Sequence, residues 1–280
     1  MGPHDMRPLD EQTILITGAT SGLGRALAAA LAPTGATLLV HGRDQSRGRR
    51  TVRKLISESG NRDIHFLLAD LASLDEVRGL ADQIIAEQPA LHTLVNNAGI
   101  GSVAPGDGER TESIDGYELR FAVNYLAGYL LTRRLLPLLR QSAPARVVNV
   151  ASAAQAPLDF EDVMLERRYD GGQAYMQSKL AQVMLTFDLA AELDGSGVTA
   201  NCLHPGTYMP TQMVLATGVT PVTALEDGVR ATMRLIDDPE LDPVSGRYFS
   251  GLEEAEAHSQ ARDTEARRRL RELSDRLVGL

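Results

Sequence analysis

The chain has 280 residues, 43% hydrophobic and 23% charged, which is enough for one large α/β domain. The net charge of −9 disfavours nucleic acid and anionic membranes as partners, and the single cysteine, Cys202, excludes an intrachain disulfide and a thiolate metal cluster. No apolar run approaches the roughly 18 residues of a membrane span, no metal-ligand spacing is present and the polar start lacks a signal-peptide core, so we expect a cytoplasmic protein without a metal.

Short apolar segments then alternate with longer amphipathic segments along most of the chain. We expect strands over 13–18, 37–43, 64–71, 91–99, 145–152 and 198–206. Helices are expected between them, over 24–35, 47–60, 73–88, 116–141 and 174–195. This alternation predicts an α/β fold: a Rossmann-type, doubly wound parallel sheet with helices on both faces.

No second core or linker is evident, so the chain is expected to form a single domain over 1–280. Within it we separate a nucleotide-binding core over 12–206, a largely apolar substrate loop over 207–227 and a charged helical tail over 252–280.

A glycine-rich loop, "TGATSGLG", follows the first expected strand. In a doubly wound sheet, ligands bind beyond the carboxyl ends of the strands, and glycines there let the backbone approach a phosphate. The following helix offers its N-terminal amides to an anion. The glycine spacing differs from the G-x-G-x-x-G fingerprint, so the loop alone is compatible with nucleotide binding or with a tight turn.

The end of the second expected strand, "HGRD", bears on the choice of cofactor. An arginine there suits the 2′-phosphate of NADP, whereas a carboxylate suits the ribose hydroxyl of NAD. Arg43 therefore favours NADP(H), and the adjacent Asp44 leaves NAD(H) possible.

Four polar residues are candidates for chemistry. Tyr175 and Lys179 are four residues apart on one expected helix, so they share a face, and a nearby ammonium lowers the pKa of a phenol. Ser152 ends the fifth expected strand and reaches the same edge of the sheet. Asn124 lies within an apolar helix and requires a polar partner, either a water or cofactor-side group or a structural contact.

Together these motifs resemble the short-chain dehydrogenase/reductase family, whose T-G-x-x-x-G-x-G motif matches Thr17 to Gly24 at every fixed position. The resemblance covers nearly the whole chain. It implies that Tyr175 is the general acid/base, that Lys179 lowers its pKa, that Ser152 orients the substrate and that Asn124 supports a water relay to Lys179. The family also implies a homodimer or homotetramer built on the helices starting near Tyr125 and Met176.

The resemblance further implies a set of cofactor contacts. Besides Arg43, they are Gly18, Thr20, Ser21, Gly22, Leu23, Gly24, Asp70, Leu71, Asn97, Ala98, Gly99, Tyr175, Lys179, Pro205, Gly206 and Thr207.

An insert between Ser152 and Tyr175, wider than the usual family spacing, and the later "SGRYF" resemble the retinol-dehydrogenase-like branch, which handles lipophilic alcohols and carbonyls. Thr211 lies five residues after Gly206, where the family pattern places Thr one residue earlier, so the loop over the nicotinamide could differ in shape. The residues after Gly206 carry no formal charge until Glu226. This suits either a loop over a hydrophobic substrate or a loop that covers core helices.

The expected function is an NADP(H)-dependent oxidoreductase. It would transfer hydride between nicotinamide and a carbonyl or secondary alcohol of an uncharged, fairly lipophilic small molecule. Two alternatives stay open: a lyase or isomerase that binds the cofactor, and a redox-inactive nucleotide-binding protein on the same fold.

Overall fold

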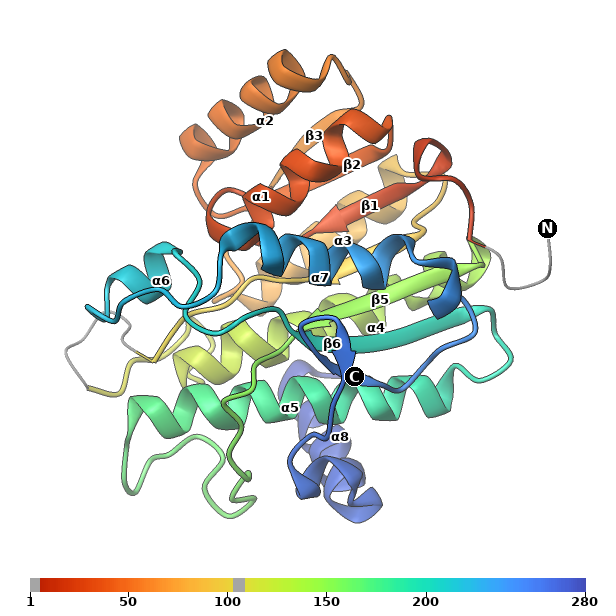
Figure 1. Cartoon of the computed structure of the whole chain (residues 1–280). Coiled ribbons are helices and arrows are strands. Elements are labelled where there is room, and N and C mark those ends of the chain that lie inside the picture. The colour runs from red at the N-terminus through yellow and green to blue at the C-terminus, as the bar shows by residue number, and fades with distance from the viewer. Residues whose placement is uncertain (1–5, 103–108) are drawn as a thin grey trace.

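The computed structural model describes residues 6–102 and 109–280. They form one eight-stranded sheet in the order β3-β2-β1-β4-β5-β6-β7-β8 (Figure 1). All neighbouring strands are parallel except β7 and β8. The strands are β1 Thr13–Ile16, β2 Thr37–Gly42, β3 Ile64–Leu68, β4 Thr93–Asn96, β5 Ala145–Val150, β6 Val198–His204, β7 Tyr248–Ser250 and β8 Glu253–Glu254.

The chain order of the strands reverses between β1 and β4, which confirms the doubly wound sheet. Strands leave β1 toward β2 and β3 on one side and toward β4, β5 and β6 on the other. The carboxyl ends of β1 and β4 therefore border the crevice in which such sheets bind ligands.

Helices cover both faces of the sheet. They are α1 Gly22–Leu31, α2 Gln45–Ser59, α3 Leu74–Glu87, α4 Ala127–Gln141, α5 Gly171–Glu192, α6 Gln212–Leu215, α7 Leu225–Asp237 and α8 Thr264–Val278. Alternate residues of β1 point to the two layers of helices, since Leu15 belongs to the apolar cluster under α3, α4 and α5, whereas Ile14 and Ile16 belong to the cluster under α1 and α7. Short 3-10 turns lie at η1 Leu9–Glu11, η2 Ala32–Thr34, η4 Pro239–Leu241 and η5 Ser259–Arg262.

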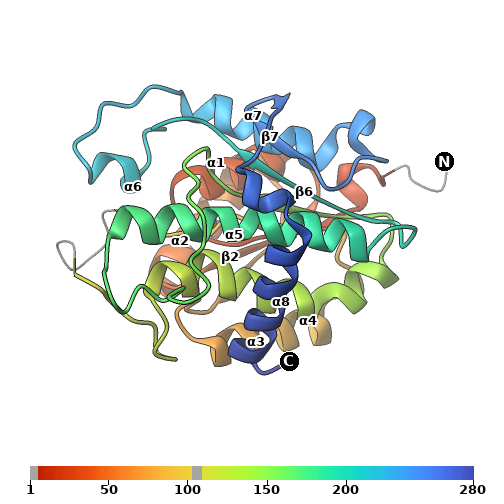
Figure 2. The ribbon, with the colours of Figure 1, turned by 90° about the horizontal axis from the view of Figure 1, so that it is seen from below.

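The C-terminal helix α8 crosses the outer side of α4 and α5 (Figure 2). The hydroxyl of Tyr125 lies 2.8 Å from that of Ser274, and Tyr129 donates a hydrogen bond to Asp275. Both tyrosines are buried within one chain. The face near Tyr125, on which we expected subunits to meet, is thus covered by the chain's own tail.

The sequence-based element bounds need three corrections. The helix expected from residue 116 starts only after Glu118, because Gly116 has a φ of +83° in a turn, and it passes through a π-helical segment, η3 Phe121–Leu126, before α4. The expected loop over 207–227 contains α6. Neither α7 nor the strands β7 and β8, which are too short to show a period, is evident from the sequence, and β8 lies in the tail expected to be helical over 252–280, where α8 starts only at Thr264.

Across residues 6–102 and 109–280, the structure contains no helix long and apolar enough to cross a membrane. The same residues hold no group of His, Cys, Asp and Glu side chains arranged to bind a metal.

Candidate active site

The glycine loop is tied to the end of β4. The hydroxyl of Thr17 accepts hydrogen bonds from the backbone N–H groups of Asn97 and Ala98, both at 3.0 Å, and the Asn97 side chain donates to the Thr17 carbonyl at 2.8 Å. Gly18 has a φ of +65°, and a Cβ there would lie 2.8 Å from the Cα of Ala98. The close approach of loop and strand therefore requires glycine at this position.

The start of α1 suits the pyrophosphate of a dinucleotide. Ser21 is the N-cap, yet within the described parts of the chain no side chain caps the first-turn amides of α1, which lie at the positive end of the helix dipole. Gly22 and Gly24 have no side chain to block these amides, and a Cβ on Gly24 would lie 2.6 Å from the Gly18 carbonyl oxygen. Thr20 and Leu23, within the loop, are buried. These residues fit the cofactor that the sequence predicts.

His41, which we did not single out from the sequence, supports this loop from below. Its Nδ1 accepts the backbone N–H of Gly18 at 3.2 Å, and its Nε2 donates to the carbonyl of Ala69 at 3.1 Å. Burial lowers the pKa of His41 to about 4, so the ring is neutral near pH 7 and keeps this acceptor. One imidazole thus joins the ends of β1, β2 and β3.

The two candidate residues after β2 differ in their contacts. Arg43 is exposed, and among the described residues no carboxylate forms an ion pair with it. The carboxylate of Asp44 instead caps α2, accepting the Arg47 N–H at 2.8 Å, and this hydrogen bond lowers the pKa of Asp44. After β3, Asp70 is half-buried and Leu71 is buried.

The segment after β6 turns back over the glycine loop. The Thr207 hydroxyl lies 3.1 Å from His204 Nε2, and the Thr207 N–H donates to the Thr223 hydroxyl at 3.1 Å. Pro205 is buried, and Gly206 lies against Thr223. The displaced Thr211 caps α6, and its methyl group would lie 3.3 Å from a Cβ on Gly22.

Ser152, Tyr175 and Lys179 meet at the carboxyl end of β5. The Lys179 Nζ lies 5.9 Å from the centroid of the Tyr175 ring, and Ser152 is buried. Burial raises the pKa of Tyr175, and the neighbouring Ser152 side chain acts in the opposite direction. The structure therefore brings a hydroxyl, a phenol and an amine to one point.

Lys179 is buried beside two acceptors. Its Nζ donates to the Val150 carbonyl and to Gln182 Oε1, both at 2.9 Å. Burial lowers the pKa of Lys179 to about 7, while the two hydrogen bonds favour the charged form. Gln182 is not among the residues predicted from the sequence, although its position three residues after Lys179 on the same helix is a usable signal.

Asn124 lies in η3 and is buried. Its Oδ1 accepts the N–H of Ile100 at 2.7 Å, and its Nδ2 donates to the Ile100 carbonyl at 3.1 Å and to Ser178 Oγ at 2.9 Å. A Cβ on Gly99 would lie 3.3 Å from Asn124 Oδ1 and 3.5 Å from Lys179 Nζ, so both side chains border this glycine. The partners of Asn124 are thus structural, and the water relay remains a prediction.

A model of the short chain dehydrogenase family matches residues 12–218. Retinol dehydrogenase 14 of Homo sapiens is 36% identical over an alignment of 296 positions, and the alignment covers 96% of this chain and 87% of that protein. Polyprenol dehydrogenase of Mus musculus is 38% identical over an alignment of 295 positions, and the alignment covers 99% of this chain and 87% of that protein.

Solved structures share the fold over most of their length. An uncharacterised protein from Mycobacterium paratuberculosis has a TM-score of 0.75 at 27% identity, covering 100% of this chain and 97% of its own. A protein from Shigella flexneri, described as a short chain dehydrogenase and crystallised with NADP, has a TM-score of 0.71 at 27% identity, covering 87% of this chain and 98% of its own.

Proposed function

Since the chain belongs to the short-chain dehydrogenase/reductase family, in a branch with the retinol dehydrogenases, we propose that Tyr175 is its general acid/base. Members of this family are NAD(P)-dependent oxidoreductases of alcohols and carbonyls, and so is this chain. The observation that carries the proposal is the meeting of Ser152, Tyr175 and Lys179 at one end of β5.

Each of these side chains has a role that follows from its chemistry. The nicotinamide, when bound, supplies or accepts the hydride. Ser152 orients the substrate oxygen, and Tyr175 gives its proton to that oxygen during reduction or takes one during oxidation. An ammonium on Lys179 stabilises the phenolate that remains. Asn124 holds the backbone beside them, and we retain its water relay to Lys179 as part of the proposal.

We propose NADP(H) as the preferred cofactor, with NAD(H) as a weaker one. Arg43 is exposed at the end of β2, whereas the competing carboxylate of Asp44 is engaged at the start of α2. The Shigella flexneri neighbour was solved with NADP, which agrees with this preference. The glycine loop would hold the pyrophosphate. The adenine side would lie against Asp70, Leu71 and residues 97–99, and the nicotinamide would lie against residues 205–207.

We propose an uncharged, lipophilic carbonyl or alcohol as the substrate. The relatives named above are named for retinol and polyprenol, which are both isoprenoid alcohols. In this chain the uncharged segment after Gly206 spans the site, since Thr211 contacts Gly22 and Met213 contacts Gly101. An apolar cover suits a substrate that has few polar groups.

A substrate screen tests this proposal. NADPH oxidation is followed with all-trans-retinal, geranial and decanal, and with glyceraldehyde as a small polar control. The proposal expects turnover of at least one lipophilic aldehyde, faster with NADPH than with NADH, and little with glyceraldehyde. Tight NADPH binding, with neither oxidation of NADPH by any aldehyde nor reduction of NADP by the matching alcohols, would favour the lyase, isomerase or redox-inactive alternatives.

A homodimer or homotetramer and a cytoplasmic location remain predictions from the sequence. If subunits associate, we expect the interface to lie outside Tyr125 and Tyr129, because α8 covers these residues. Light scattering measures the assembly directly.

A further inference from the structure

A buried ion pair lies one helical turn before Asn124, and the mechanism above does not use it. The side chains of Glu118 and Arg120 are 0% and 3% exposed, and their charged groups are 3.5 Å apart. Glu118 Oε2 also accepts the N–H of Phe121 at 2.7 Å, at the start of η3. Two charges are seldom buried unless both find several partners.

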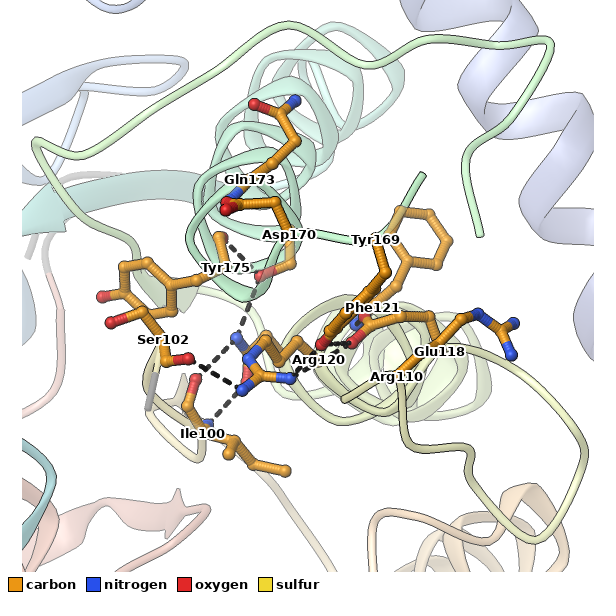
Figure 3. A network of polar contacts seen from close by, with 12 residues as sticks. Ile100, Ser102, Arg110, Glu118, Arg120, Phe121, Tyr169, Asp170, Gln173 and Tyr175 are labelled. Carbon is orange, nitrogen blue, oxygen red and sulfur yellow. Dashed lines mark hydrogen bonds and ion pairs between the residues drawn. The ribbon is translucent and has the colours of Figure 1, made fainter. Parts of the chain in front are cut away.

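The Arg120 guanidinium joins three segments of the chain (Figure 3). Its Nε donates to the Gly101 carbonyl at 2.9 Å and its Nη2 to the Ser102 carbonyl at 2.8 Å. Its Nη1 donates to the hydroxyl of Tyr169, which belongs to the insert before α5. One side chain therefore connects the segment after β4, the end of the insert and the helix that carries Asn124.

Tyr169 completes the cluster by serving both charges. Its hydroxyl accepts from Arg120 and donates to Glu118 Oε1 at 3.2 Å. Burial, followed by the charge of Glu118, raises the pKa of Tyr169 to about 12, so the phenol keeps the proton that it donates. The insert thus ends on a residue whose hydroxyl has both a donor and an acceptor partner.

The first turn of α5 rests against the same guanidinium. A Cβ on Gly171 would lie 2.9 Å from the Ser102 carbonyl oxygen and 3.4 Å from Arg120 Nη2, so only glycine allows this approach. Asp170 caps α5 by accepting the N–H of Gln173 at 2.7 Å. Tyr175 lies one turn further along α5, so the position of its phenol depends on where this helix begins.

The segment after β4 is held to one helix by two side chains. Asn124 pairs with both backbone groups of Ile100, and Arg120 takes the carbonyls of the next two residues. On its other side, Gly101 lies against Met213 of α6. This short segment therefore lies between α6 and the start of α5.

We propose that Arg120, together with Glu118 and Tyr169, is a positioning residue that sets the space in which a substrate meets Tyr175. It fixes the segment after β4 and the first turn of α5 relative to each other. The planar guanidinium serves four acceptors in different directions, which a lysine ammonium on its flexible stem does not reproduce. The catalytic part of this inference rests on the proposed function.

The test compares three variants with the wild type. They are Tyr169→Phe, Arg120→Lys, and a double variant that combines Arg120→Met and Glu118→Gln. With all-trans-retinal and NADPH, we expect kcat/KM to fall about tenfold to hundredfold in the double variant, as misplacement near a reacting centre does. We expect a smaller fall of kcat/KM in Tyr169→Phe. In Arg120→Lys we expect kcat/KM to lie between the values of the double variant and the wild type. The Kd for NADPH should stay near the wild-type value in all three.

Arg146→Met is the matched control. Arg146 is as buried as Arg120, with a 3% exposed side chain, and it pairs with Asp242, but it lies near the amino end of β5, away from Tyr175. This variant should lose thermal stability without changing kcat/KM after correction for the folded fraction. Equal losses of kcat/KM in Arg146→Met and in the Arg120 variants would overturn the proposal.

Hydrogen exchange separates this proposal from the proposed function. The amides of residues 100–102 and 171–175 should exchange faster in Tyr169→Phe and in the Arg120 variants, and not in Arg146→Met. This readout holds even if the wild type turns over none of the aldehydes. If the Arg120 variants do not fold, Tyr169→Phe decides: unchanged exchange and unchanged kcat/KM in that variant contradict the proposal.

Discussion

Lys179 donates a hydrogen bond to Gln182, three residues further along α5, over 2.9 Å. The ammonium is otherwise buried, with the Val150 carbonyl as its second acceptor. A neutral amide oxygen stabilises the charge without neutralising it. Gln182 therefore helps to decide how much of Lys179 is charged near pH 7.

Replacing Gln182 by Leu should lower the pKa of Lys179 further below its wild-type value of about 7. The charged form is then lost at lower pH. We expect the basic limb of kcat/KM for NADPH, which reports groups of the free enzyme, to move to lower pH. Gln83→Leu, on the exposed side of α3, is the control and should leave the profile unchanged. Superimposable profiles for Gln182→Leu and wild type would contradict the assignment.

Lys179 also makes stability depend on pH. Its pKa is about 7 in the folded chain against an ordinary value of 10.5 for lysine, so between these values the unfolded chain binds one more proton. Stability relative to Lys179→Met should therefore rise with pH by up to about 1.4 kcal/mol per pH unit in this window and be flat below it. Urea unfolding of both proteins at several pH values measures the difference. A difference that falls as the pH rises has the wrong sign for a buried lysine.

Arg43→Ala should weaken NADPH binding more than NADH binding. A charge-assisted contact to the 2′-phosphate contributes about 1.5–3 kcal/mol, so the Kd for NADPH should rise about tenfold or more. Fluorescence titration with both cofactors measures the ratio. Arg62→Ala, an exposed arginine before β3, should change neither Kd. Equal weakening of both cofactors by Arg43→Ala would remove the NADP assignment.

Gly18→Ala should damage the cofactor loop. The new Cβ would lie 2.8 Å from Ala98 Cα in a backbone with a φ of +65°, and such strain costs about 1–3 kcal/mol. We expect a lower melting temperature and weaker NADPH binding, which differential scanning fluorimetry with and without NADPH measures. Gly79→Ala in α3 meets nothing within 4 Å and should stabilise the helix by roughly 0.5–1 kcal/mol. Similar effects of the two substitutions would refute the close-approach argument.

The main parts of the site could be predicted because their signals are local. Tyr175 and Lys179 share one helix, so their spacing alone places them together. Ser152 and the glycine loop follow strands, and parallel strands bring their carboxyl ends to one edge. The fold followed from the same alternation of apolar and amphipathic segments.

The remaining features depend on contacts between distant residues, which periodicity does not encode. Arg120 and Tyr169 are 49 positions apart, and neither stands out within its own segment. The contact of Tyr125 with Ser274 joins residues 149 positions apart, and it lies on the helix face where the sequence predicts a subunit interface. In η3, the backbone departs from the regular helix that the apolar pattern predicts, and an apolar run of six residues does not mark a π-helical turn.

Tyr175→Phe tests the central claim most directly. We expect NADPH binding to stay close to the wild-type value and kcat with a substrate from the screen to fall at least about 10²- to 10⁴-fold, the contribution of a positioned proton donor. Tyr117→Phe is the control, because its hydroxyl donates to the Leu277 carbonyl of α8 and not into the site. Undiminished NADPH oxidation by folded Tyr175→Phe would contradict the assignment of Tyr175 as the general acid/base.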